Sequence, residues 1–153
     1  MDAKIHNYSY FCARNEKFLP MKAFILRYPL SIAIILLVTY LSFFKPPQTE
    51  LDDVPGIDKL AHTAMYFVMA GLLWFEFYRG RRKTNAPMWH AWVGAFFCPL
   101  IYGGLVELLQ EYCTEYRGGE WLDFAANSSG VILAAILAVT LLPKLLKKFD
   151  KRV

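Results

Sequence analysis

Four long apolar runs restrict what this chain can fold into. A helix needs about 20 mostly apolar residues to cross about 30 Å of hydrocarbon. The runs at Lys22–Phe44, Asp58–Tyr78, Trp89–Gln110 and Trp121–Leu142 all meet that length. Since 56% of the 153 residues are hydrophobic and most of them lie in these runs, no room remains for a separate soluble domain. We therefore predict an all-α fold, a bundle of four transmembrane helices in which short connections make neighbouring helices antiparallel.

Lysine and arginine are distributed unevenly around the four runs. Fourteen of the seventeen basic residues flank one side of the predicted bundle, and only Lys45, Lys59 and Arg117 belong to the other. Because an excess of these residues marks the cytoplasmic side of a membrane, we expect both termini in the cytoplasm. The basic stretches then serve as topology signals and as contacts to membrane lipids, so we expect no nucleic-acid partner.

The same pattern divides the chain into three parts. Residues 1–21 form a cytoplasmic or interfacial N-terminal segment, 22–142 the four-helix membrane domain, and 143–153 a basic cytoplasmic tail. Within the membrane domain, Pro29 lies near the start of the first run, where proline is tolerated. Pro99 lies inside the third run, where it should bend the helix.

Polar residues open the second run on one side of the predicted helix. Asp58, His62 and Tyr66 are spaced i, i+4, i+8, so they share one helix face, and Lys59 lies beside Asp58. Near the other end of the same run, we interpret Glu76 as a residue at the membrane–water interface. The second helix thus presents an ionisable stripe near one membrane surface only.

Two further polar groups belong to the same end of the bundle. Glu107 and Gln110 close the third run, while Asp123 and Asn127 open the fourth, with Arg117 just before it. Charged side chains inside a bilayer cost roughly 2.5–3.5 kcal/mol each on insertion scales, so such a group indicates a functional site. We expect three helices to enclose a polar pocket that opens to the outside and has an apolar floor.

The residue types in this pocket suggest roles for its members. His62, Glu107 and Asp123 are the candidate catalytic residues, because an imidazole beside a carboxylate can act as a general acid/base pair. Arg117 has a planar guanidinium that suits a phosphate or carboxylate. The candidate ligand-binding residues are Asp58, Lys59, Tyr66, Gln110, Arg117 and Asn127.

Each of these residues also has a structural interpretation. His62 could form a hydrogen-bonded contact between helices, Asp58 and Asp123 could cap helix starts, and Glu107 could belong to a salt bridge. We expect no cofactor and no metal ion, because one histidine and no thiolate make a poor zinc site.

The order of these motifs resembles that of the VanZ-like membrane proteins. The matching elements are D-K-x-x-H-x-x-x-Y at residues 58–66, E-x-x-Q at 107–110, and R-x5-D-x-x-x-N-x-x-G at 117–130. The resemblance covers residues 22–142 and implies a small protein of the bacterial cytoplasmic membrane. One founding member of that family is linked to resistance to the glycopeptide teicoplanin, and no reaction is established for the family as a whole.

Three functions fit these observations. The first is a membrane protein whose pocket binds, and if it is an enzyme modifies, a polar cell-envelope or lipid-linked ligand. The second is a non-enzymatic accessory protein whose polar residues only lock the helices together. The third is a small transporter or channel, which with four thin spans would require a homo-oligomer. The sequence leaves open which ligand is bound and whether a reaction is catalysed.

Overall fold

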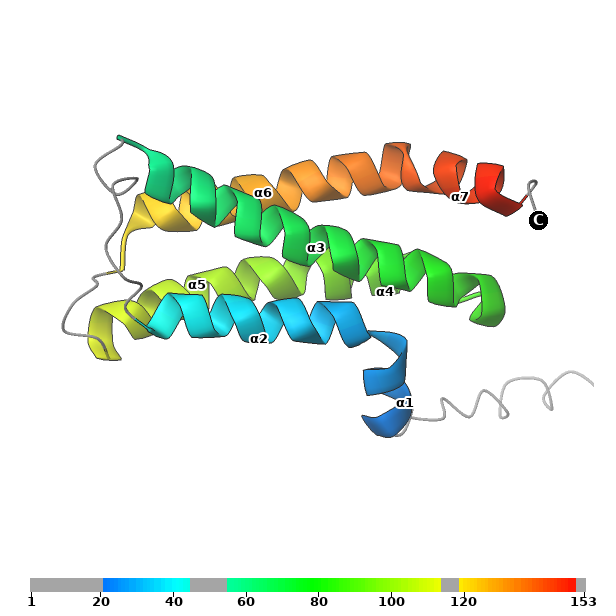
Figure 1. The fold of residues 1–153 in the computed structure, drawn as a ribbon, viewed down its shortest axis with the longest axis horizontal. Coiled ribbons are helices and arrows are strands. Elements are labelled where there is room, and N and C mark those ends of the chain that lie inside the picture. The colour runs from blue at the N-terminus through cyan, green and yellow to red at the C-terminus, as the bar shows by residue number, and fades with distance from the viewer. Residues whose placement is uncertain (1–20, 45–54, 114–118, 151–153) are drawn as a thin grey trace, which may run out of the picture.

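The computed structural model describes residues 21–44, 55–113 and 119–150, and in these ranges the protein is all-helical (Figure 1). Its elements are α1 (Met21–Arg27), α2 (Pro29–Phe43), α3 (Ile57–Thr84), α4 (Trp89–Trp92), the π-helical turn η2 (Val93–Phe97), α5 (Cys98–Cys113), α6 (Trp121–Thr140) and α7 (Leu142–Asp150). The predicted all-α class is confirmed for the described residues.

Three helical segments are long and apolar enough to cross a membrane. They are Ile57–Arg82, Trp89–Cys113 and Trp121–Thr140, and they correspond to the second, third and fourth predicted spans. The first predicted span is different, because its apolar helix α2 has only 15 residues. At 1.5 Å per residue it is about 22 Å long, which is less than the thickness of the hydrocarbon core.

The break between α1 and α2 has an identifiable cause. Pro29 occupies the first position of α2 and has no N–H to continue the preceding helix. The start of α2 is instead held by Glu76 of α3. The backbone N–H groups of Leu30 and Ser31 each donate to its carboxylate at 3.0 Å, and the Ser31 hydroxyl donates at 2.6 Å. Glu76 is therefore a buried anchor, and our interfacial interpretation of it is wrong.

The third predicted span contains a local change of helical pitch rather than a simple proline bend. The π-helical turn η2 directly precedes α5, whose second residue is Pro99. A π-turn adds one residue to the helical turn, and such bulges accommodate disruptions of the regular hydrogen-bond ladder. Proline causes such a disruption because it lacks an amide proton.

Helices α3 and α6 pack closely along their length, and glycine makes this approach feasible. A Cβ atom added to Gly130 of α6 would lie 2.3 Å from the Thr63 carbonyl oxygen of α3. The interface then continues through Met69 and Ala70 of α3 and Val131 and Ala134 of α6, all of which are buried. Only a residue without a side chain lets the two backbones meet at this point.

The helices run so that four of their ends meet. Figure 1 shows α2 and α5 ending, and α3 and α6 beginning, at the left-hand end of the bundle. The opposite end carries α1 and α7. The predicted antiparallel order of neighbouring helices is therefore present, and it brings the polar starts of α3 and α6 to the polar end of α5.

Candidate functional site

Side chains from three helices form one polar cluster at the left-hand end of the bundle. We define the polar cluster as Asp58, Lys59 and His62 of α3, Glu107 of α5, and Glu120, Asp123 and Asn127 at the start of α6. His62, Glu107, Asp123 and Asn127 are buried, with at most 7% of each residue exposed. The convergence of α3, α5 and α6 predicted from the sequence is thus observed.

A chain of hydrogen bonds crosses the buried part of the polar cluster. Asn127 Nδ2 donates to Glu107 Oε1 at 3.1 Å, and Asn127 Oδ1 lies 3.0 Å from His62 Nδ1. Because an amide oxygen only accepts hydrogen bonds, His62 Nδ1 is the donor in this pair. The opposite orientation of the amide would turn its oxygen toward the Glu107 carboxylate, which also only accepts when ionised.

This series of hydrogen bonds changes the predicted pairing of His62 with Glu107. We expected His62 to pair directly with Glu107 or Asp123, but the Asn127 amide lies between His62 and Glu107 and bonds to both. A neutral amide can serve both neighbours because it carries a donor and an acceptor. Glu107 therefore orients His62 through Asn127.

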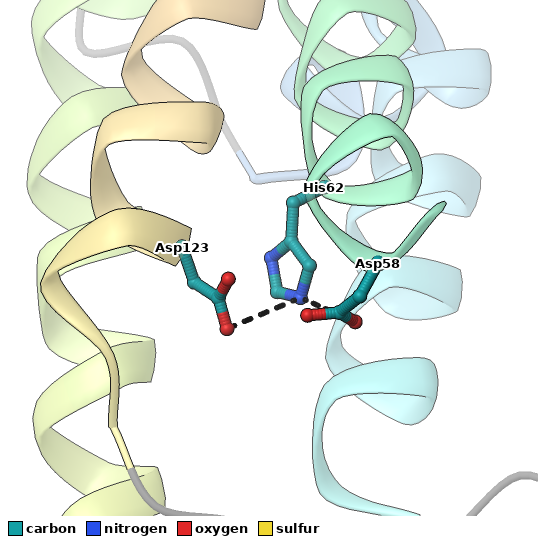
Figure 2. A group of neighbouring side chains, drawn as sticks. All are labelled: Asp58, His62 and Asp123. Carbon is teal, nitrogen blue, oxygen red and sulfur yellow. Dashed lines mark ion pairs between the residues drawn. The ribbon is translucent and has the colours of Figure 1, made fainter. Parts of the chain in front are cut away.

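The second ring nitrogen of His62 faces two aspartates, as Figure 2 shows. His62 Nε2 lies 3.6 Å from Asp58 Oδ1 and 3.8 Å from Asp123 Oδ2. One potential ligand atom from each of these three residues lies within 4.8 Å of the others. Nδ1 thus donates to Asn127, and Nε2 is the ring nitrogen that faces the two aspartates.

Lys59 is bound by carboxylates of the polar cluster. Its ammonium nitrogen contacts Asp123 Oδ1, lies 2.6 Å from Glu120 Oε2, and lies 3.4 Å from Asp58 Oδ2. We expected Lys59 to bind an anionic ligand, but its contacts here are to this chain's own acidic groups. Three carboxylates around one ammonium leave the described part of the site with excess negative charge.

Glu120 is a member of the polar cluster that we did not predict from the sequence. Besides its ion pair with Lys59, its backbone N–H donates to Glu107 Oε2 at 3.2 Å. It lies at the N-cap position of α6, so the chain places a second acidic residue one turn from Asp123. The position of Glu120 immediately before the fourth apolar run is the sequence feature that could have placed it in the polar cluster.

Two predicted ligand-binding residues, Gln110 and Tyr66, lie outside the polar cluster. The Gln110 amide donates to the Ser42 carbonyl oxygen at 2.8 Å, which ties α5 to the end of α2. Tyr66 is buried one turn below His62, against the position of Gly103. The Tyr66 hydroxyl has no hydrogen-bond partner among the described residues. Arg117 lies outside the described residues.

The two aspartates are not N-caps. Gly56 is the N-cap residue of α3 and Glu120 that of α6, and neither helix start has a capping hydrogen bond from a side chain. Asp58 and Asp123 instead lie within the first turns, where the helix dipole still favours a negative charge. Their side chains are turned toward His62 and Lys59.

A hollow of about 500 Å³ adjoins the polar cluster between α5 and α6. We call it the α5–α6 hollow. Its apolar lining includes Leu105 and Phe124, and Glu107, Glu111 and Glu120 contribute its acidic part. A second hollow of about 630 Å³ has no residue of the polar cluster in its lining. The expected polar pocket is therefore a packed polar cluster with a largely apolar hollow beside it.

Comparisons of this chain with protein-family models, with curated proteins and with solved structures find no match.

Proposed function

We propose that this protein is a four-pass protein of the bacterial cytoplasmic membrane that binds an amphiphilic cell-envelope molecule. The polar head of the ligand contacts the polar cluster, and its hydrocarbon chain lies in the α5–α6 hollow. The single observation that carries this proposal is the contact between the two, since Glu107 and Glu120 belong to both the cluster and the lining of the hollow.

Chemistry supports an amphiphile over a fully polar solute. The lining of the α5–α6 hollow is mainly apolar, as in most small-molecule sites, with few polar groups to fix orientation. Buried ionisable residues in a membrane are costly and generally mark a substrate path or binding site. A lipid-linked molecule of the cell envelope presents a polar head and an apolar chain at this depth of the bilayer.

The resemblance to VanZ-like proteins supports the same proposal. Three of the residues that carry it, His62, Glu107 and Asn127, form the hydrogen-bonded chain. Under this proposal the polar cluster faces the outside and both termini lie in the cytoplasm, as the positions of the basic residues indicate. A link to glycopeptide resistance is an analogy with one family member.

A reaction on this ligand would use His62 as its base. Nδ1 donates to Asn127, and we assign the transfer of a proton from a hydroxyl to Nε2, which faces Asp58 and Asp123. Hydrolysis or group transfer on a lipid-linked substrate is the reaction class that fits. His62→Gln should then abolish turnover while leaving the amount of folded protein in the membrane unchanged.

Native mass spectrometry of the purified protein tests ligand binding. Gly104 lines the α5–α6 hollow, and a Cβ added there would meet the Phe124 ring at an ordinary contact distance of 3.4 Å. Gly104→Leu should therefore fill the hollow while the helices remain packed. We expect a lipid-sized adduct on the unaltered protein and its loss in Gly104→Leu.

A matched variant controls for the introduction of a leucine. A Cβ at Gly71 of α3 has no atom within 4 Å, and this residue is absent from the lining of the hollow. Gly71→Leu should retain the adduct. If Gly104→Leu retains it equally, the α5–α6 hollow does not hold the ligand.

The structural alternative has support of its own, because Asn127 and Lys59 already satisfy several members of the polar cluster. If the cluster only locks the helices, Glu107→Gln should lower the melting temperature without a separate loss of ligand.

A transporter has less support. Along α3 between His62 and Glu76, Met69, Ala70 and Trp74 are buried and apolar, which does not favour the passage of a polar solute.

A further inference from the structure

One imidazole nitrogen and two carboxylate oxygens are arranged as ligands of a single cation. His62 Nε2 lies 3.6 Å from Asp58 Oδ1 and 3.8 Å from Asp123 Oδ2 (Figure 2). Ligands at about 2.0–2.2 Å from a tetrahedral metal ion lie about 3.3–3.6 Å from one another. Small side-chain movements would therefore bring all three atoms to bonding distance.

The orientation of His62 matches that of a metal ligand. Histidines that bind metal ions almost always donate a hydrogen bond from their other ring nitrogen, which fixes the tautomer and the ring plane. Here Nδ1 donates to Asn127 Oδ1, and the Asn127 amide is fixed in turn by Glu107. The lone pair of Nε2 is thereby directed toward the two aspartates. Asn127 and Glu107 lie outside the three-ligand set, so this is an independent observation.

The aspartates are oriented from their opposite side. Lys59 contacts Asp123 through Oδ1 and Asp58 through Oδ2. The remaining oxygen of each carboxylate is the one that faces His62. Lys59 therefore orients the two carboxylates through the oxygens that point away from His62.

The local charge also favours a cation. In the described part of the chain the polar cluster contains four carboxylates, on Asp58, Glu107, Glu120 and Asp123, but only one ammonium, on Lys59. Glu107 and Asp123 are buried, and buried charges are costly unless they are paired or coordinate a metal ion. A divalent cation bound by Asp58, His62 and Asp123 offsets this excess.

We propose that Asp58, His62 and Asp123 bind a divalent transition-metal cation such as Mn²⁺ or Zn²⁺. Mixed imidazole and carboxylate ligands suit these ions. Three protein ligands leave a coordination position open, as in catalytic metal sites. The role of this metal ion rests on the proposed function. The open coordination position would take an anionic group of the ligand head, such as a phosphate oxygen. This replaces our expectation that the site holds no metal.

Mn²⁺ binding to the full-length protein in detergent tests the site directly. After treatment with a chelator, the protein is titrated with Mn²⁺, and free Mn²⁺ is followed by electron paramagnetic resonance. Mn²⁺ is the probe because it prefers oxygen and nitrogen ligands to the exposed thiols of Cys98 and Cys113. We expect one tightly bound Mn²⁺ per chain.

Two ligand variants and one control decide the result. Loss of an outer-shell partner weakens metal binding by about 10–100-fold, so His62→Gln and Asp58→Asn should each weaken Mn²⁺ binding at least tenfold. His90→Gln, which alters a histidine in the lining of the second hollow, should have no effect. The Asp58 side chain is 53% exposed, so Asp58→Asn keeps the test valid even if His62→Gln fails to fold.

The outcomes separate this inference from the proposed function. No Mn²⁺ binding, or equal binding by Asp58→Asn, overturns the metal site, and a lipid adduct that Gly104→Leu removes would still support the proposed function. Conversely, Mn²⁺ binding that Asp58→Asn weakens supports the metal site even if no lipid adduct is found.

Discussion

At the scale of single residues, Asn127 connects the two halves of the polar cluster. It is almost fully buried, and its amide gives one hydrogen bond to Glu107 and receives one from His62. An aspartate could not donate to Glu107 when ionised, and an aliphatic residue could do neither. The identity of this one side chain therefore fixes which nitrogen of His62 carries the proton donated to Asn127 and which faces the aspartates.

Asn127→Ala should destabilise the protein, because it leaves buried polar atoms of His62 and Glu107 without their partner. An unsatisfied buried group costs about 1–3 kcal/mol, and about 2–4 °C of melting temperature corresponds to each kcal/mol for a chain of this size. We expect a fall of roughly 2–12 °C by thermal unfolding in detergent.

Ser128→Ala is the matched control for this variant. The Ser128 hydroxyl donates to the Phe124 carbonyl oxygen of its own helix at 2.8 Å, so its removal should change the melting temperature little. Equal melting temperatures for the two variants would show that Asn127 does not bridge α3 and α5.

Sequence spacing predicted correctly which side chains lie close together where both belong to one face of the same helix. The i, i+4 relation of Asp58 and His62 placed both on one face, and the two side chains do meet. Spacing could not predict that Asn127 separates His62 from Glu107, or that Glu120 pairs with Lys59. Those contacts depend on the relative rotation and height of different helices, which no single periodic pattern contains.

At the scale of elements, the contact between α3 and α6 sets the geometry of the site. His62 and Thr63 of α3 lie opposite Asn127 and Gly130 of α6, where the two backbones approach most closely. The Thr63 hydroxyl also lies 3.2 Å from the Ala126 carbonyl oxygen, a second hydrogen bond between the helices. A small separation of these helices would disrupt the polar cluster.

Gly130→Ala should force α3 and α6 apart. The new methyl group would lie 2.3 Å from backbone oxygen, which cannot move as a side chain can, and overpacking of this kind costs about 1–3 kcal/mol. We expect a lower melting temperature than for the unaltered protein. Gly71→Ala, where the added methyl has open space, should be neutral or slightly stabilising since alanine favours helix.

The anchor of α2 gives a second test at this scale. Glu76→Gln retains one acceptor oxygen in place of the two that receive hydrogen bonds from Leu30 and Ser31. The loss should lower stability by about 1–2 kcal/mol, as for other helix N-terminal partners. Ser31→Ala removes only the hydroxyl contact and should have a smaller effect in the same unfolding assay. An unchanged melting temperature for Glu76→Gln would contradict the anchoring role.

At the scale of the whole molecule, hydropathy predicted the helical class and four spans, and three of these are long and apolar enough to cross a membrane. It did not predict that the first apolar run is divided into α1 and α2. Total hydropathy is unaffected by Pro29, whereas helix continuity depends on the missing amide proton and on Glu76, which lies 46 positions away from Leu30. Nonlocal contacts of this kind do not leave a signal in the apolar pattern.

The number of passes can be tested with fusions to reporter domains. If α1 and α2 together complete a fourth pass, both termini lie in the cytoplasm, as the distribution of lysine and arginine indicates. A C-terminal green fluorescent protein should then be fluorescent, and a C-terminal alkaline phosphatase inactive. An N-terminal fluorescent fusion should behave in the same way. Reporters that place the two termini on opposite sides would show an odd number of passes.

Disulfide cross-linking in native membranes tests most directly whether α3 and α6 bring the polar cluster together. The hydroxyl oxygens of Thr63 and Ser129 lie 3.3 Å apart, so cysteines at both positions are close enough to bond after oxidation. In a background without the native cysteines, Thr63→Cys with Ser129→Cys should lose thiol labelling on oxidation. Thr63→Cys with Ser128→Cys, one position around α6, should remain labelled. Full labelling of the first pair would contradict the account, since His62 and Asn127 could not then meet.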